Sequence, residues 1–421
     1  MQKKNNFVLK LIIIITVSLS SQTVFAMIHP DTLLINSSRE GDYQAVQSAF
    51  KIGANVNAVD IYGNSSLHYA AEKRFLTIAD LLIEKGANVN LKNNEGTTPI
   101  FIPVKFSSYY IVRLLLDTGA ELNIEALETT PLYEAIKYKN IKMAEILLDN
   151  GAKPNFFPST EMSPLAYTAL MGDYQMSELL IRYGADVNCL ESYKKSRHKY
   201  SILMFNVRKE KFEIAKLLIE NGADVNYQNG LSSVLSYAIN DTCYDIIKLL
   251  IEKGANINFI NENNETILMK AATKGNLEIF KLLIENGADF DLTNVTNVEV
   301  LKNAIRKNKY DIFKYCIELG FDLNARSAGN TSVLMTSVYY RCDSCFQYLL
   351  EKGADLNLTN DVGMSALTYA IEIEDLNTIK YLVEKGADVS LMNNEEKTPL
   401  AYAIESKNKE IINFLKSKGA E

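Results

Sequence analysis

A single period runs along almost the whole chain. Glycine recurs at intervals of 33 residues, apart from two intervals of 32 and one of 38. All but one of these glycines precede an alanine, and they are Gly53, Gly86, Gly119, Gly151, Gly184, Gly222, Gly254, Gly287, Gly320, Gly353, Gly386 and Gly419. A fixed period near 33 indicates a repeat array, whereas length alone would favour two or three globular domains.

A second landmark stands 21 residues before each of these glycines. It is Glu299 in one unit and Ser or Thr in the others: Thr32, Ser65, Thr98, Thr130, Ser163, Ser201, Ser233, Thr266, Ser332, Ser365 and Thr398. Every change of length therefore falls between a glycine and the next Ser or Thr. We interpret the constant block as the packed unit and the variable connector as a surface loop.

The start of the block has the pattern of a short helix. A Ser or Thr hydroxyl can accept a hydrogen bond from the free N–H groups at a helix start, and proline is tolerated directly after it. Leu67, Ala70 and Ala71 share one face at the i, i+3, i+4 spacing. Prolines follow the cap at Pro99, Pro131, Pro164 and Pro399.

The second half of the block predicts a second helix. Ile78, Leu81 and Leu82 form an apolar stripe, and the periodic glycine ends the helix in a left-handed cap. Asn or Asp often stands four residues after the glycine, where its side chain can hydrogen-bond to nearby backbone and hold the connector. Examples are Asn57, Asn90, Asn188, Asn226, Asp291 and Asn357.

The motifs resemble those of ankyrin repeats. They include Thr98-Pro99-Ile100, Thr130-Pro131-Leu132, Ser163-Pro164-Leu165, Thr398-Pro399-Leu400 and Ser66-Leu67-His68-Tyr69-Ala70-Ala71, each with Gly-Ala downstream. The resemblance implies an all-α solenoid of about twelve helix-turn-helix units with hairpin-like connectors and a concave face that binds a protein. It places an N-terminal capping repeat at 27–57, ankyrin repeats at 58–390 and a C-terminal capping repeat at 391–421.

Two departures from the pattern lead to local expectations. Pro103 falls inside the first helix of its unit, where it removes a backbone hydrogen bond, so we expect a kink there. The unit that starts at Glu299 lacks the Ser or Thr cap, so we expect this unit to be locally soft, that is, of lower local stability.

The first 26 residues have the order of a secretory signal peptide. Lys3 and Lys4 form a positive start, an apolar run extends from Leu11 to Leu19, and small residues precede a cleavage site after Ala26. A membrane anchor is the alternative, but a span needs roughly 20 apolar residues. We therefore expect export by the general secretory route to the periplasm or the medium, with no membrane span after cleavage.

Composition and spacing argue against several functions. The formal charge is −7 and no basic tract dominates the chain, so we expect no nucleic-acid partner. The three histidines and five cysteines have no spacing of a metal site, and we expect no metal and no cofactor. Stacked repeats contact only their neighbours, so we expect no catalysis. We expect His68 to brace a hairpin by hydrogen bonds.

Cys342 and Cys345 form the sharpest chemical candidate. Cys342 lies at the turn that starts a second helix, where a thiol pKa can be lowered, while Cys345 and Cys316 fall in the buried stripe. A redox or disulfide function is possible for the first two cysteines. We favour ordinary core packing because the strand-helix-strand context of a thioredoxin-like site is missing.

Two groups of residues are candidates for partner binding. Aromatic residues stand two positions after the core leucine of several first helices, at Tyr69, Tyr167, Phe205, Tyr237 and Tyr369. They form either packing contacts between repeats or an aromatic stripe on the concave face, where tyrosine is typical of binding surfaces. The longest connector carries Lys194, Lys195, Arg197 and Lys199, which form either a solvated finger or a positive tip for an acidic partner.

The sequence therefore predicts a monomeric, non-catalytic scaffold that is exported and binds a protein of unknown identity through its concave face and hairpin tips. Two alternatives within this class are a secreted factor directed at a host or competitor cell and an immunity-type protein that neutralises an exported toxin. An enzyme is the rival from another class, and it would need a non-repeat segment longer than the connector at 189–200.

Overall fold

The computed structural model describes residues 29–158, 161–192, 199–241, 243–290 and 295–421. The signal segment at 1–26 lies outside the described residues, as do Lys194, Lys195 and Arg197 of the basic connector. The chain divides into an N-terminal unit that ends at Glu191 and a C-terminal unit that begins at Ser192.

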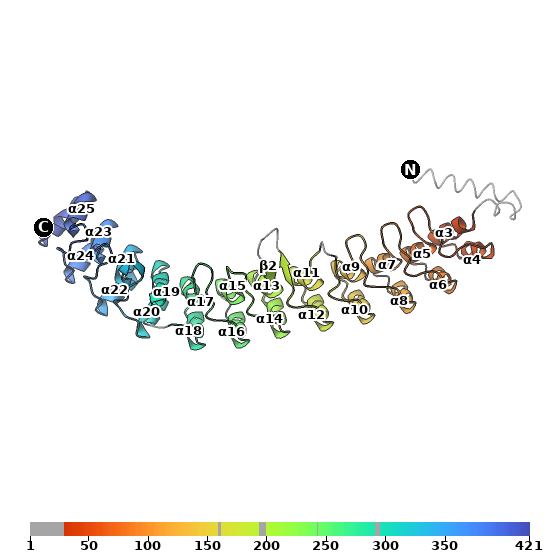
Figure 1. The fold of residues 1–421 in the computed structure, drawn as a ribbon, viewed down its shortest axis with the longest axis horizontal. Coiled ribbons are helices and arrows are strands. Elements are labelled where there is room, and N and C mark those ends of the chain that lie inside the picture. Colours follow the sequence, from red (N-terminus) through yellow and green to blue (C-terminus); the bar gives the residue numbers. More distant parts are fainter. Residues whose placement is uncertain (1–28, 159–160, 193–198, 242, 291–294) are drawn as a thin grey trace. The chain divides into compact units, whose positions relative to one another are not determined.

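The N-terminal unit consists of helix pairs. The first helices of the pairs lie side by side in one row, and the second helices lie in another (Figure 1). The first helices are α3 (Pro30–Glu40), α5 (Ser66–Lys73), α7 (Phe101–Lys105), α9 (Pro131–Lys137) and α11 (Pro164–Met171). The second helices are α4 (Tyr43–Lys51), α6 (Leu76–Glu84), α8 (Tyr109–Asp117), α10 (Ile141–Asp149) and α12 (Tyr174–Arg182).

The C-terminal unit repeats the same two rows (Figure 1). Its first helices are α13 (Ile202–Arg208), α15 (Val234–Asp241), α17 (Ile267–Lys274), α19 (Val295–Arg306), α21 (Val333–Tyr339), α23 (Ala366–Glu372) and α25 (Pro399–Glu405). Its second helices are α14 (Phe212–Glu220), α16 (Tyr244–Glu252), α18 (Leu277–Glu285), α20 (Tyr310–Glu318), α22 (Asp343–Glu351), α24 (Leu376–Glu384) and α26 (Lys409–Ser417). Short elements in the connectors are β1 (Leu190–Ser192), β2 (Lys199–Ser201) and the 3₁₀ turn η1 (Ala328–Asn330).

The two units together hold twelve helix pairs among the described residues, α3/α4 to α25/α26. The expected all-α solenoid of helix-turn-helix units is thus confirmed. Its core lies between the rows, where leucine, isoleucine and alanine side chains of both helices are buried. Burial of a leucine or isoleucine side chain contributes roughly 1.5–3 kcal/mol, and apolar burial is the main stabilising contribution.

The predicted caps are present in most units. Ser65, Thr130, Ser163, Ser201, Thr266, Ser332, Ser365 and Thr398 are N-caps, and each side-chain oxygen accepts a hydrogen bond from the N–H three residues later. Each periodic glycine has a positive φ, as at Gly86, where φ is 85°. Only glycine adopts this conformation without strain, which explains its place at the end of every second helix.

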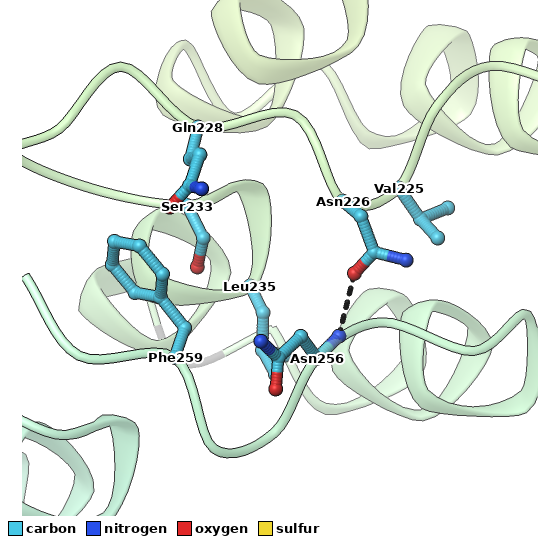
Figure 2. Close-up of a pocket in the computed structure, with 7 residues that line it drawn as sticks. All are labelled: Val225, Asn226, Gln228, Ser233, Leu235, Asn256 and Phe259. Carbon is cyan, nitrogen blue, oxygen red and sulfur yellow. Dashed lines mark hydrogen bonds between the residues drawn. The ribbon is translucent and has the colours of Figure 1, made fainter.

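The asparagine after each glycine has a wider role than the predicted local hydrogen bond. Asn226 Nδ2 donates to the Gly254 carbonyl at 2.9 Å, and Asn226 Oδ1 accepts from the Asn256 N–H at 2.7 Å (Figure 2). Asn57 and Asn90 make the same pair of bonds to the following repeat. The side chain therefore joins successive repeats rather than only closing its own connector.

Pro103 does not kink a helix, so that expectation is wrong. The helix of its unit, α7, begins at Phe101, two residues later in the register than α9, which begins at Pro131 directly after its cap. Pro103 therefore lies in the first turn of a short helix, where a missing N–H interrupts no intrahelical hydrogen bond. The chain removes the conflict by delaying the helix start.

Two local features depart from the regular pattern. The unit with Glu299 at the cap position has a longer first helix, because α19 begins at Val295 and continues through Glu299. In α16, Leu249 is only half-buried, whereas the adjacent Leu250 is fully buried. The helix of the first unit therefore starts before Glu299, and its expected local softness stays a prediction.

Candidate functional site

Positions within a repeat are counted here from the capping Ser or Thr. The fourth and seventh positions are four and seven residues after the cap, and the pre-cap position is the residue immediately before it. The first-helix face is defined by the side chains at the fourth, seventh and eighth positions of the first helices. All five predicted aromatic residues occupy the fourth position.

The predicted aromatic residues differ in exposure. Tyr69 and Phe205 are buried, with 9% and 8% of their surface exposed. Tyr167, Tyr237 and Tyr369 are half-buried, so each has one packed side and one side open to solvent. The two interpretations of the stripe are therefore not exclusive, because the same ring can pack against a neighbouring repeat and present an edge to a partner.

Tyr69 is held in a closed polar network. Its hydroxyl donates to Asp60 Oδ2 at 2.5 Å, and the Arg39 guanidinium lies 4.1 Å from the ring centroid. Arg39 Nη2 also donates to Asp60 Oδ2 at 3.1 Å. Burial, together with the hydrogen bond to Asp60, raises the pKa of Tyr69. The network fixes the ring and fills the space above it with a charge from the same chain.

The other three fourth-position tyrosines also contact side chains of their own unit. Tyr167 lies 5.6 Å from Tyr133 between ring centroids. The Arg208 guanidinium lies 5.8 Å from the centroid of Tyr237. Tyr369 accepts a hydrogen bond from Asn360 Nδ2 at 3.1 Å. These contacts orient the rings, and an oriented ring loses little conformational entropy when a partner binds.

Of the predicted basic residues, the structure describes only Lys199. It lies at the start of β2 with an exposed side chain, and its carbonyl accepts a hydrogen bond from the Tyr227 hydroxyl at 2.9 Å. Lys194, Lys195 and Arg197 lie outside the described residues, so the basic tip stays a prediction.

A second aromatic group lies on the first-helix face and was not predicted from the sequence. Tyr339 and Tyr340 are the seventh and eighth positions of their repeat, and 49% and 43% of their surfaces are exposed. Tyr339 lies 5.1 Å from Tyr340 and 5.8 Å from Tyr369 between ring centroids. The signal that could have found them is the adjacent tyrosine pair at positions where several other repeats carry Arg or Lys.

His68 has the expected structural role. Its Nδ1 accepts from the Ser65 N–H at 3.1 Å, which assigns the proton to Nε2, and Nε2 donates to the Thr97 carbonyl at 3.2 Å. Thr97 belongs to the next connector, so the imidazole braces a helix start against the following hairpin. Burial lowers the pKa of His68.

The cysteines give one correction. Cys342 and Cys345 are joined by a disulfide, and both are fully buried, so the preference for unbonded core packing is wrong. The two residues are three apart at the start of α22, a spacing that brings their side chains together on one turn. Cys316 is buried as predicted, and burial raises the pKa of its thiol to about 12.

A cavity of about 340 Å³ lies beneath the connectors of the C-terminal unit (Figure 2). Its lining residues are Val225, Asn226, Gln228, Ser233, Leu235, Asn256 and Phe259. None of these side chains is an acid, a base or a thiol, so the lining holds no group that could activate the Ser233 hydroxyl as a nucleophile. Among the described residues, no group of three or more His, Cys, Asp and Glu side chains could hold a metal ion. No described helix is long and apolar enough to cross a membrane.

Paired helices in two rows, joined by hairpin connectors, define a helical repeat protein. The family model of ankyrin repeats in three copies matches residues 4–93, 33–126, 89–157, 124–191, 203–294, 234–327, 268–360 and 334–421. The chain therefore belongs to the ankyrin-repeat family. Ankyrin repeats are in general protein–protein interaction modules, and the family is in general not enzymatic.

Curated relatives match only a small part of the chain. A stretch of 71 residues is 37% identical to neurogenic locus notch homolog protein 1 of Xenopus tropicalis, Mus musculus and Homo sapiens. The stretch covers 17% of this chain and 3% of each of those proteins. The similarity is therefore confined to about two repeats.

Proposed function

We propose that this protein is an exported, non-catalytic scaffold that binds a partner protein through its first-helix face and hairpin connectors. The observation that carries the proposal is the half-buried tyrosine that recurs at one register, at Tyr167, Tyr237 and Tyr369. Tyrosine supplies a large and stiff contact area, and binding surfaces are enriched in it. Protein binding is also what the ankyrin-repeat family generally does.

The place of action is part of the proposal. The order Lys3, Lys4, Leu11 to Leu19 and Ala26 supports export to the periplasm or the medium. N-terminal sequencing of the protein from the cell exterior or the periplasm should then begin at Met27. A full-length product confined to the cytosol would contradict export and leave the binding proposal standing.

Partner binding is tested by alanine substitution at the fourth position. The partner is first captured with the mature chain and identified by mass spectrometry. We expect Tyr167→Ala together with Tyr237→Ala to weaken its binding at least tenfold, because truncation of a tyrosine hot spot usually costs about 2 kcal/mol or more. Circular dichroism and thermal melting should be unchanged, and the two single variants report on the two units separately.

Tyr402 is the matched control for these variants. It occupies the same fourth position in the last repeat, where its hydroxyl accepts a hydrogen bond from Asn393 Nδ2 at 2.8 Å. Tyr402→Ala should affect binding less than the double variant. If the double variant binds normally and melts earlier, the tyrosines are packing residues between repeats and the proposed face is wrong.

A further inference from the structure

A second cavity lies on the first-helix face of α19, α21 and α23 and measures about 330 Å³. Its lining includes Tyr339, Tyr340, Tyr369, Met364, Glu372 and Lys302. The Tyr339 ring stands at 85° to Tyr340 and at 79° to Tyr369. The three rings therefore present both faces and edges to the cavity. The face of an aromatic ring attracts a cation.

The last repeat shows what a tyrosine and a glutamate in this register can hold. Tyr402 and Glu405 occupy the fourth and seventh positions, as Tyr369 and Glu372 do one repeat earlier. In the last repeat, Lys397 Nζ lies 5.9 Å from the Tyr402 ring centroid and 3.0 Å from Glu405 Oε1. The hydrogen bond to Glu405 raises the pKa of Lys397. The Tyr402 ring and the Glu405 carboxylate, together with Glu395 Oε2 at 3.6 Å from Nζ, thus surround an ammonium group of the same chain.

In two other repeats a cation also lies over the fourth-position tyrosine, but it comes from a different position of the chain. Arg39 lies over Tyr69 and Arg208 lies over Tyr237, and each arginine is the seventh position of the preceding repeat. The chain therefore has two sources for this cation, the pre-cap position of the same repeat and the seventh position of the preceding one.

Both sources are uncharged at Tyr369. The pre-cap residue is Met364, where the last repeat has Lys397, and the seventh position of the preceding repeat is Tyr339 instead of arginine. Glu372 is exposed and forms no ion pair with any residue that the structure describes. The cavity therefore has the aromatic faces and the carboxylate of a cation site, without a cation from its own surroundings.

Lys302 does not supply that cation. Its Nζ donates to Glu299 Oε1 at 3.0 Å and to Ser327 Oγ at 3.0 Å. The ammonium charge is therefore balanced by a carboxylate of its own helix, α19, and its hydrogen-bonding capacity is largely used.

We propose that this cavity binds the side chain of a lysine or arginine presented by the partner protein, with the cation against the tyrosine rings and near the Glu372 carboxylate. The inference rests on the proposed function, in which the first-helix face binds a protein, and names the chemistry of one contact. The apolar stem of such a side chain packs on Met364 and the ring faces, while the charged end meets Glu372.

The test uses three peptides that differ at one residue. The first has a central lysine flanked by glycine and serine, the second has norleucine in place of lysine, and the third has glutamate. The full chain carries ¹³C-labelled methionine methyl groups, and the resonances of Met335 and Met364 report on binding because both residues line the cavity. We expect the lysine peptide to shift both resonances saturably and to bind about tenfold more tightly than the norleucine peptide.

Four variants separate a cation site from an apolar pocket. Met364→Lys introduces the residue that the last repeat uses, so it should occupy the cavity and abolish binding of the lysine peptide. Glu372→Gln should weaken binding about fivefold by removing the carboxylate. Tyr340→Phe should retain binding because the ring remains, whereas Tyr340→Leu should lose most of it. Tyr340 is exposed, so these changes leave the fold intact.

Four results would overturn the inference. Equal affinity of the lysine and norleucine peptides would identify an apolar pocket, and tighter binding of the glutamate peptide would give the opposite charge preference. Absence of saturable shifts with the lysine peptide would mean that there is no site. If Met364→Lys leaves the affinity for the captured partner unchanged while Tyr167→Ala weakens it, the proposed function stands and this inference fails.

Discussion

The repeats around Tyr69 and Tyr369 share one frame and differ in a single layer of contacts. In both, the tyrosine hydroxyl is hydrogen-bonded to an Asp or Asn side chain nine residues earlier, Asp60 in one and Asn360 in the other. In the N-terminal unit, the guanidinium of Arg39, from the preceding repeat, covers one face of the Tyr69 ring. In the C-terminal unit, Tyr339 occupies the equivalent position and leaves a cavity.

The difference shows how a repeat protein separates stability from recognition. The Asp60 carboxylate is saturated, since it accepts from Arg39 and Tyr69 and also from the N–H groups of Tyr62 and Asn64. A network in which every acceptor is hydrogen-bonded stabilises the fold, and it has few free acceptors for hydrogen bonds to a partner. At the same registers the repeat of Tyr369 has Tyr339 in place of Arg39, Asn360 in place of Asp60 and Met364 in place of Asn64, so its tyrosine has no such charged network.

The frame that both regions share should give the largest effect. Leu283 is fully buried in α18, and Leu283→Asp places an unpaired carboxylate in the core. We expect a loss of unfolding free energy on the order of 4 kcal/mol. Chemical denaturation followed by circular dichroism measures it.

The control for this variant is Leu249→Asp in α16, where the side chain is only half-buried. Its carboxylate can reach water, so the destabilisation should be clearly smaller. Equal losses for the two variants would show that the burial difference between the stripe positions has no energetic consequence.

The shared frame was largely predictable from the sequence, because its signals are local. The cap at Ser65, the glycine at Gly86 and the stripe between them each follow from backbone sterics and helix periodicity. The kink expected at Pro103 was wrong because a local rule has more than one solution, and helix lengths differ between repeats for the same reason. At Pro103 the chain shortens a helix, and at Glu299 it lengthens one.

The site was predictable only in part. The fourth-position aromatic residues were found because they share a register with the core leucine. The Tyr369 cavity was missed because it depends on three successive repeats, from Lys302 to Glu372. The Cys342–Cys345 disulfide was only an alternative because Cys345 also fits the buried stripe, and a pattern of burial does not distinguish a thiol from a bonded sulfur.

A pH titration should distinguish the two regions by a smaller effect. Both use a capping box, with His68 at the third position in α5 and Thr368 at the same position in α23. Burial lowers the pKa of His68 from 6.5, so below about pH 6.5 the unfolded chain binds a proton that the folded chain does not. Stability around α5 should therefore decrease as the pH falls through this value, and the decrease should stop below the folded pKa.

Amide hydrogen exchange at pH 7.5 and pH 5.5, corrected for intrinsic rates, measures this local stability. We expect the protection of α5 to fall at the lower pH more than that of α23, where Thr368 does not titrate in this range. His68→Gln keeps an acceptor for the Ser65 N–H and a donor for the Thr97 carbonyl, and it should remove the difference. A pH response of α5 that persists in His68→Gln would assign the effect to another group.

The smallest expected effect comes from removing the Lys397–Glu405 ion pair in the last repeat. Lys397→Met removes the ammonium that lies over Tyr402 and beside Glu405, and it reproduces the pre-cap residue found at Met364. Lys397 and Glu405 are an exposed pair, so the free energy of unfolding should change little. The lysine peptide should then gain a second site, reported by the introduced methionine methyl group.

That site should be weaker than the Tyr369 cavity because Tyr339 and Tyr340 have no aromatic counterparts there: the matching residues are Glu372 and Ile373. If no second site appears although the fold is intact, the Tyr and Glu pair is not sufficient, and the difference between closed and open repeats lies in the additional rings instead.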